Sequence, residues 1–578
     1  MAAAEIMLTP AVKEVGSGYT ATFLSLLFGV AVALVAYYRM SRRRLYQLAA
    51  DIPGPTGYPL LGNALEFVGS PNDVFTRIVN KGDTYKNMLR MWIGPRLLVF
   101  IYKPDDVEVL LSSSQHINKG QDYDFFRPWL GNGLLISGGD TWRRHRKLIA
   151  PTFHLNILKS FIDLFNANSR MLVTRLKKES ATRREFDVHD YMSECTVETL
   201  LETVMGLDKT TQNETSGYDY AMAVMKVCDI LHLRHTKMWL RPDFIFNMTK
   251  HSKEQDLHLN TIHSLTTNVM NKKKENYFQS KNSINGSAQK EKTVVETNNA
   301  KNKTETKKKT DAKNGEESKF SYGQAAGLKD DLDVDDVDFV LGEKKRMAFL
   351  DLMIQSSQDG NLITDKEIKE QVDTIMFEGH DTTAAATSFF MCLMGCRPDI
   401  QEKCLQEVDS LFGDSDRYIT FEDTLELKYL ERCIMETLRL FPPVPLISRQ
   451  LEEEMRLSSC DVVIPKKTTV VVGTYRIHRR EDIYPNPDHF DPDNFLPERS
   501  ANRHYYSFIP FSAGPRSCVG RKYAMLKLKV ILATVLRYYK VLPGLHYDKW
   551  KLQADIILKR TDGFMCRIES RRDYNAKK

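Results

Sequence analysis

The stretch Phe511–Gly520, FSAGPRSCVG, places one cysteine between two glycines and puts an arginine two residues before it. Glycine tolerates tight turns and close approach of the backbone, so Gly514 and Gly520 predict a compact loop around Cys518. The thiol could be an ordinary buried side chain, or it could have a chemical role that also explains Arg516. The rest of the chain decides between these alternatives.

Composition limits the classes of protein to consider. The chain has 578 residues, which suits one large or two ordinary domains. Its charged fraction of 27% and formal net charge of +6 are ordinary for a globular protein and do not indicate a nucleic-acid partner. The nine cysteines are scattered without a CxxC pair, which fits reduced thiols in a cytosol-facing protein and reveals no zinc site.

The N-terminal region predicts a membrane anchor at residues 19–38, YTATFLSLLFGVAVALVAYY. About twenty uncharged residues are enough to cross the hydrocarbon core as a helix. Four arginines lie at positions 39 to 44 whereas only Lys13 precedes the span, so residues 1–18 are expected to be lumenal and the C-terminal side cytosolic. A cleaved signal peptide is the alternative, but its basic residues should precede the apolar run.

After the anchor, residues 39–55 form a basic and proline-rich linker that ends in the stiff sequence Pro53-Gly54-Pro55. The catalytic domain is expected to occupy residues 56–578. Within it, residues 271–345 are strongly polar, lysine-rich at first and aspartate-rich near the end. Such a segment has little to bury, and it predicts a mobile surface insertion that is either a solvated linker or a docking element.

The strongest helix signal follows the insertion. Thr364 and Glu367 have the spacing of a capping box, and no proline occurs until Pro398. The middle of this helix reads FEGHDTTAAATSFF, residues 377–390. Polar side chains inside an apolar helix are unfavourable unless they are paired or used, and residues four apart share a face, as Glu378 and Thr382 do.

Several weaker motifs precede the cysteine in a fixed order: Trp142-Arg-Arg-His-Arg146, an ExxR at Glu436 to Arg439, Arg449, and a PER ending at Arg499. None is specific alone. With FxxGxRxCxG and GHDTT, however, they resemble the cytochrome P-450 superfamily of haem-thiolate monooxygenases over the chain from the anchor to about Cys566. This resemblance implies a mainly α fold with a small β portion and a haem b cofactor.

The resemblance also implies a role for each motif on the cysteine side. Cys518 is the expected axial ligand of the haem iron, where an electron-rich thiolate favours O–O cleavage. Arg516, Arg449, Trp142 and Arg146 fall at positions that hold the haem propionates through charge-assisted hydrogen bonds. Glu436, Arg439 and Arg499 are expected to form a buried ion network that fixes the structural core, and breaking it should cost roughly 3 to 5 kcal/mol.

On the oxygen side, the resemblance assigns Asp381 and Thr382 to oxygen binding and proton delivery. WRRHRKLIAPTFH and FEGHDTT resemble the fourth family, whose members commonly oxidise fatty acids and related long chains. In that family the glutamate at the position of Glu378 can form an ester with a haem methyl group; the alternative is a free carboxylate. With this pattern, the long charged insertion resembles the insect G subfamily, which makes cuticular hydrocarbons by oxidative decarbonylation of long-chain aldehydes.

These resemblances imply an enzyme of the endoplasmic reticulum membrane that receives electrons from an NADPH-dependent cytochrome reductase, with cytochrome b5 as a further partner. The chain has no GxGxxG and flavin module of its own. Arg143, Arg144 and Lys147 are candidates for contact with an acidic partner. Decarbonylation of a long-chain aliphatic aldehyde is the favoured reaction. Terminal hydroxylation of fatty acids and a haem-binding sensor without turnover are the alternatives.

Overall fold

The helix predicted from Thr364 forms as α15, Asp365–Cys396, and the capping box is present. Thr364 Oγ1 accepts from the Glu367 N–H at 3.2 Å, and a Glu367 carboxylate oxygen accepts from the Thr364 N–H at 2.9 Å. The structure is a computed structural model that describes residues 11–207, 217–292, 347–358 and 362–571. Helix α15 is buried along most of its length, so the elements around it are arranged by their packing against it.

The predicted mainly α architecture with a small β portion is confirmed. The other α-helices are α1 (Ala11–Ser41), α2 (Arg43–Ala50), α3 (Pro71–Thr84), α4 (Pro104–Leu111), α5 (Arg127–Leu130), α6 (Gly139–Ile149), α7 (Leu155–Lys159), α8 (Ile162–Thr182), α9 (Val188–Thr203), α10 (Gly217–Thr236), α11 (Asp243–Phe246), α12 (Lys250–Lys292), α14 (Phe349–Gln358), α16 (Pro398–Phe412), α17 (Phe421–Glu426), α18 (Lys428–Leu440), α19 (Thr474–Ile477), α20 (Pro497–Ser500) and α21 (Arg521–Tyr538). The 3-10 helices are η1 (Ala64–Phe67), η2 (Gln121–Phe126), η3 (Ala150–Phe153), η5 (Met238–Leu240), η10 (Pro492–Phe495), η11 (Tyr505–Ser507) and η12 (Tyr547–Lys549).

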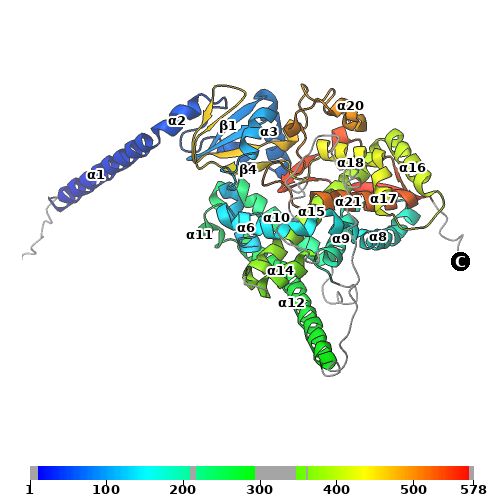
Figure 1. Cartoon of the computed structure of the whole chain (residues 1–578). Helices are drawn as coiled ribbons and strands as arrows, with labels where there is room; N and C mark the ends of the chain where they lie inside the picture. The colour runs from blue at the N-terminus through cyan, green and yellow to red at the C-terminus, as the bar shows by residue number, and fades with distance from the viewer. Residues whose placement is uncertain (1–10, 208–216, 293–346, 359–361, 572–578) are drawn as a thin grey trace, which may run out of the picture.

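The strands form small sheets beside the helical body. They are β1 (Met88–Ile93), β2 (Arg96–Ile101), β3 (Phe186–Asp187), β4 (Ile447–Gln450), β5 (Met455–Arg456), β6 (Val463–Ile464), β7 (Thr469–Val472), β8 (Tyr539–Leu542), β9 (Leu552–Asp555), β10 (Ile557–Arg560) and β11 (Met565–Ser570). The largest sheet has the order β1-β2-β7-β4, with β2 and β7 parallel and the other pairs antiparallel. In Figure 1 this sheet lies next to α2 and α3, at the end of the body from which α1 extends.

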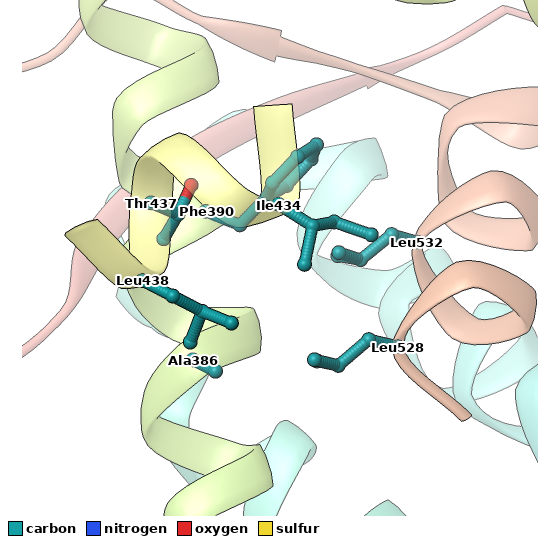
Figure 2. A pocket seen from close by; sticks show the side chains of 7 residues that line it. All are labelled: Ala386, Phe390, Ile434, Thr437, Leu438, Leu528 and Leu532. Atoms are coloured by element: carbon teal, nitrogen blue, oxygen red, sulfur yellow. The ribbon is translucent and has the colours of Figure 1, made fainter. Parts of the chain in front are cut away.

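Helices α9, α18 and α21 pack against α15 and close the core around it. Figure 2 shows the layer between three of these helices, which leaves only a gap too small for a water molecule, lined by Ala386, Phe390, Ile434, Thr437, Leu438, Leu528 and Leu532. Apolar interdigitation of this kind has the density of a molecular crystal, so the helices cannot shift independently. The cysteine-bearing segment and α15 are therefore held in a fixed relation.

The N-terminal region differs in part from its prediction. Among the described residues, one helix is long and apolar enough to cross a membrane, namely Ala21–Ser41 within α1, with a mean hydropathy of 2.0 and none of it buried against the body. Figure 1 shows α1 as a rod that leaves the body. The segment predicted as a linker, residues 39–55, contains α2 and packs on the protein, because Ala49 and Ile52 are each only 1% exposed.

The predicted insertion, residues 271–345, also begins differently from what its composition indicates. Helix α12, Lys250–Lys292, continues through its first part, because the apolar positions before residue 271 start a helix that the polar residues prolong. Residues 293–346 lie outside the described residues. The prediction of a mobile insertion with a docking role therefore stays a prediction.

Candidate active site

The loop around Cys518 is set by close backbone contacts. Gly514 has φ +70°, and a Cβ there would lie 1.9 Å from the carbonyl oxygen of Leu111, so only glycine fits. The Cys518 N–H donates to the carbonyl of Phe511 at 2.9 Å, which closes the loop. Gly520 is the N-cap of α21, and its backbone N–H acts to lower the pKa of the Cys518 thiol. This effect agrees with the predicted approach of a backbone N–H to the sulfur.

The Cys518 thiol faces an internal space. Its side chain is exposed, yet burial raises the pKa of the thiol to about 11, with the negative charge of Glu378 adding to the effect. These two observations are compatible only if the sulfur opens onto a space inside the protein and not onto bulk water. A positive centre bound at the sulfur would reverse this shift and favour the thiolate.

A group of buried cations surrounds this space. Arg516 donates to the carbonyls of Ile117 at 2.6 Å and Ser137 at 2.7 Å. Its guanidinium lies 4.9 Å from the ring centroid of Trp142. Arg449 is 2% exposed and donates to the carbonyl of Ser448 at 3.0 Å. Among the described residues, neither arginine forms an ion pair with a carboxylate.

Burial and mutual repulsion lower the pKa values of two of these cations. Burial, followed by the neighbouring Arg449, lowers the pKa of Arg516 to about 9. Burial and then the same two arginines lower the pKa of Lys119 well below its ordinary value. The Lys119 Nζ lies 4.7 Å from the ring centroid of Tyr123. Sequence reasoning missed Lys119, because a lone lysine in a loop carries no motif.

Helix α6 brings its two predicted side chains to the same place. Arg146 Nη1 donates to the carbonyl oxygen of Ser517 at 2.9 Å, directly before the cysteine. Trp142 is 6% exposed and packs under Arg516. The predicted group of Trp142, Arg146, Arg449 and Arg516 is therefore assembled around Cys518.

The opposite wall of the space comes from α15. Between Gln371 and Gly395 every residue of this helix is buried except Glu378, Gly379 and Thr382, which are half-buried. Glu378 and Thr382 therefore share the face that was predicted for them. Cations from across the space, Lys119 first, partly offset the burial that raises the pKa of Glu378. Thr382 Oγ1 donates to the backbone carbonyl of Glu378 at 2.7 Å.

These residues fit a haem. The structure provides a sulfur for the iron, several buried cations without carboxylate partners for the two propionates, and a half-buried helix face opposite. Buried cations need an anion to offset their desolvation, and planar guanidinium groups match carboxylates. The residues around Cys518 thus agree with haem, the cofactor that the sequence resemblance implies.

Asp381 lies on another face of α15 and is fully buried. Its Oδ1 is 3.7 Å from Lys559 Nζ on β10, a residue that the sequence did not indicate. Burial raises the pKa of Asp381, but Lys559 and then His380 and His189 outweigh it, so the pKa lies below its ordinary value. No hydrogen bond joins the Asp381 carboxylate to the Thr382 hydroxyl, so the structure does not bring this predicted pair together directly.

The buried pair of Glu436 and Arg439 forms as predicted. Both side chains are 0% exposed, and Arg439 Nε and Nη2 donate to the two Glu436 oxygens at 2.7 and 2.8 Å. Arg439 also donates to the carbonyls of His478, Pro487 and His489. The pair thereby ties α18 to a segment that leads toward the cysteine loop.

The prediction that Arg499 belongs to this network is wrong. Its side chain is 52% exposed and, within the described part of the chain, pairs with Asp491 alone, at 2.9 Å, because α20 lies at the surface. The remaining donors to Glu436 are the Asp491 N–H at 2.8 Å and Asn494 Nδ2 at 3.2 Å. Asn494 is the buried partner from the same stretch, and its amide donates without adding a second positive charge.

This difference can be tested by comparing Asn494→Ala with Arg499→Ala. The first removes a donor to a buried carboxylate and should lower the free energy of unfolding by about 1 to 3 kcal/mol. The second breaks an exposed ion pair, and we expect a loss below about 1 kcal/mol. Denaturant unfolding of both full-length variants measures this. A larger loss in Arg499→Ala would restore the network predicted from the sequence.

The ion pair of Asp381 predicts a shift in pH dependence. Replacing Lys559 by Met removes the main positive charge that keeps the Asp381 pKa low, so burial should raise that pKa. If substrate oxidation requires ionised Asp381, the acid limb of its pH profile should move to higher pH in Lys559→Met and stay in place in Lys559→Arg. Identical profiles in all three proteins would contradict this role.

Comparison with known proteins agrees with this site. The family model Cytochrome P450 matches residues 52–566. Cytochrome P450 4g15 of Drosophila melanogaster is 56% identical over 564 residues, covering 96% of this chain and 97% of that protein. Cytochrome P450 4g1 of the same organism is 46% identical, with coverage of 94% and 93%, and Cytochrome P450 4V2 of Homo sapiens is 34% identical, with 94% and 95%. The chain belongs to the cytochrome P450 family, within its fourth family, and is a haem-dependent monooxygenase.

Proposed function

We propose that this monooxygenase converts long-chain aldehydes to hydrocarbons by oxidative decarbonylation. The observation that carries the proposal is the order of similarity among its relatives. Two 4g proteins are 56% and 46% identical, whereas Cytochrome P450 4c3 of the same organism is 36% identical over a similar length. The G subfamily is the one whose resemblance implied this reaction.

The walls of the site support an aliphatic substrate. Phe377, next to Glu378 on α15, lies 4.4 Å from Trp129 and 6.3 Å from Phe126, measured between ring centroids. All three side chains are buried. An apolar wall beside the half-buried face of α15 excludes water and favours a hydrocarbon chain over a polar ligand.

The haem supplies dioxygen activation when it is bound, and the side chains around it have separate roles. Cys518 would hold the haem through its sulfur, and Arg449, Arg516, Arg146 and Trp142 would hold and orient it through its carboxylate groups. On the other wall, Thr382 presents a hydroxyl that can accept and pass on a proton. Asp381, kept ionised by Lys559, is proposed to accept a proton and relay it to this hydroxyl.

We propose that the protein sits on the endoplasmic reticulum membrane through α1 and a second apolar contact. Leu60 is 93% exposed, and Trp239, Phe244 and Met248 are 57%, 71% and 86% exposed. The segment around Leu60 and the segment that holds Trp239, Phe244 and Met248 approach each other at Gly94. A Cβ at Gly94 would lie 3.3 Å from Met238 and 3.8 Å from Leu60. Exposed apolar side chains gathered near an anchor favour contact with a lipid surface. The domain after this anchor, residues 56–578, would then face the cytosol.

Electrons are proposed to come from an NADPH-cytochrome reductase, with cytochrome b5 as a second donor. Of the three basic residues predicted to meet an acidic partner, Arg144 is bound to Glu367 and to the carbonyl of Leu362. Arg143 is bound to Asp140 at 2.8 Å but remains 51% exposed. The docking proposal on α6 therefore rests on Arg143 and on Lys147, which is exposed.

The substrate proposal is tested by product analysis. The full-length protein in membranes with reductase and NADPH should convert a long-chain aldehyde, labelled at the aldehyde carbon, to a hydrocarbon one carbon shorter that lacks the label. Mass spectrometry measures this, and Cys518→Ala is the inactive control. Formation of terminally hydroxylated fatty acids, with no hydrocarbon from the aldehyde, would make hydroxylation the function instead.

We also propose that Glu378 forms an ester with a haem methyl group. Its carboxylate lies on the half-buried face of α15 and interacts electrostatically with Cys518. After turnover, some haem should stay with the polypeptide through acid and organic extraction, and Glu378→Gln, which keeps the size of the side chain, should release all of it. Equal retention in both proteins would contradict the ester, as would complete release from the unmodified protein.

A further inference from the structure

Lys527 of α21 is a buried lysine that no part of the site described above uses. Its side chain is 0% exposed, and among the described residues it pairs with no carboxylate. Nζ donates to the carbonyl oxygens of Gly379 at 3.0 Å and Thr196 at 3.5 Å. Lys529 lies two residues further along α21, on a different face of the helix. Unlike Lys527 it pairs with a carboxylate, that of Glu431, and it donates to the carbonyl of Thr424 at 2.8 Å.

An ammonium group in this position works against stability. Carbonyl oxygens solvate a cation only in part, so a buried lysine without a counter-ion is less favourable than an apolar side chain of the same length. Burial accordingly lowers the pKa of Lys527 to about 7. Unfavourable groups that the fold nevertheless holds in place concentrate where function constrains the local geometry.

The carbonyl that Lys527 binds belongs to the turn of α15 that forms the oxygen-side wall. In a regular helix each carbonyl accepts one N–H from the next turn. Here three successive carbonyls also accept side-chain donors. Glu378 O accepts from Thr382 Oγ1, and Gly379 O accepts from Lys527 Nζ and from Thr383 Oγ1 at 3.2 Å. His380 O lies 3.3 Å from Thr196 Oγ1, whose hydroxyl is shared with Ser193 O of its own helix at 3.0 Å.

Additional donors on helix carbonyls tilt them outward and bend the helix locally. The two donors from outside α15 come from neighbouring helices, Lys527 from α21 and Thr196 from α9, and both helices pack on α15. Helix α9 comes close because position 379 is glycine, where a Cβ would lie 2.9 Å from a Leu200 methyl carbon. The side-chain donors that act on this turn of α15 therefore come from α21, the helix that follows Cys518, and from α9.

We propose that Lys527 is a positioning residue for the monooxygenase reaction, which holds the Gly379 carbonyl turned toward α21 and thereby sets the orientation of Thr382 and Asp381 at the oxygen side of the haem. Because α21 begins three residues after Cys518, the same helix fixes the ligand at its start and the opposite wall through Lys527. The proposal concerns the shared chemistry of the family and does not depend on which aliphatic substrate is used.

The test compares Lys527→Met with Lys529→Met in the full-length, haem-containing protein. Lys527→Met should keep the carbon monoxide spectrum of thiolate ligation and a melting temperature no lower than that of the unmodified protein. It should shift the g values of the ferric electron paramagnetic resonance signal and raise the share of NADPH electrons that is lost as peroxide. Lys529→Met removes the buried ion pair with Glu431, so its melting temperature should fall while the g values and the peroxide share stay unchanged.

A second pair of variants covers the case in which Lys527→Met does not fold. Thr196→Val removes the uncharged donor to the next carbonyl, and we expect the g values to shift in the same sense. The matched control is Thr199→Val, whose hydroxyl donates to Cys195 O of its own helix at 2.6 Å and not to α15 in the part of the chain that the structure describes. Unchanged g values and peroxide share in Lys527→Met, or equal spectra for Thr196→Val and Thr199→Val, would overturn the proposal.

Discussion

The buried pair of Glu436 and Arg439 is the interaction on which the arrangement of the site depends. Through it, α18 binds carbonyls at His478, Pro487 and His489 and an N–H at Asp491, which are separate points of the chain that leads to the cysteine loop. Removing one partner would leave an uncompensated buried charge and several unbonded carbonyls, at a cost of about 3 to 5 kcal/mol. Domains are stable by only about 5 to 15 kcal/mol, so this loss would remove a large fraction of the stability that holds the loop in place.

How much the sequence predicted depends on whether a residue acts with its neighbours in the chain or with distant ones. The capped helix α15 was predictable because its cap partners lie within one turn and leave a spacing. Cys518 and the pair of Glu436 and Arg439 were predictable because they lie in short motifs that resemble those of the family. Lys119 and Lys559 were not, because each meets its partner through tertiary packing and belongs to no motif.

The error at Arg499 has the same origin. Asn494 and Arg499 occur in one short stretch, and the resemblance of the PER segment to the family pattern assigned the arginine to the network of Glu436. Packing favoured the amide, because η10 is buried whereas α20 lies at the surface. A second arginine would also have placed an additional positive charge next to Arg439, which the interior does not favour.

Asp381 and Thr382 lie on different faces of α15, which their adjacent positions in the sequence do not reveal. Asp381 is buried behind the turn that presents Thr382, so the proposed proton transfer between them requires a bridging water or rotation of the carboxylate.

The cations around Cys518 have a consequence for the life of the protein in the cell. Arg449, Arg516 and Lys119 repel one another until an anion is bound among them, so folding and haem binding are thermodynamically linked. A ligand that binds only the folded state stabilises it by about 2.7 kcal/mol when its free concentration is a hundred times its dissociation constant. Newly made chains would therefore be most vulnerable to proteolysis when haem is scarce, and the amount of protein would follow the haem supply as closely as it follows the rate of synthesis.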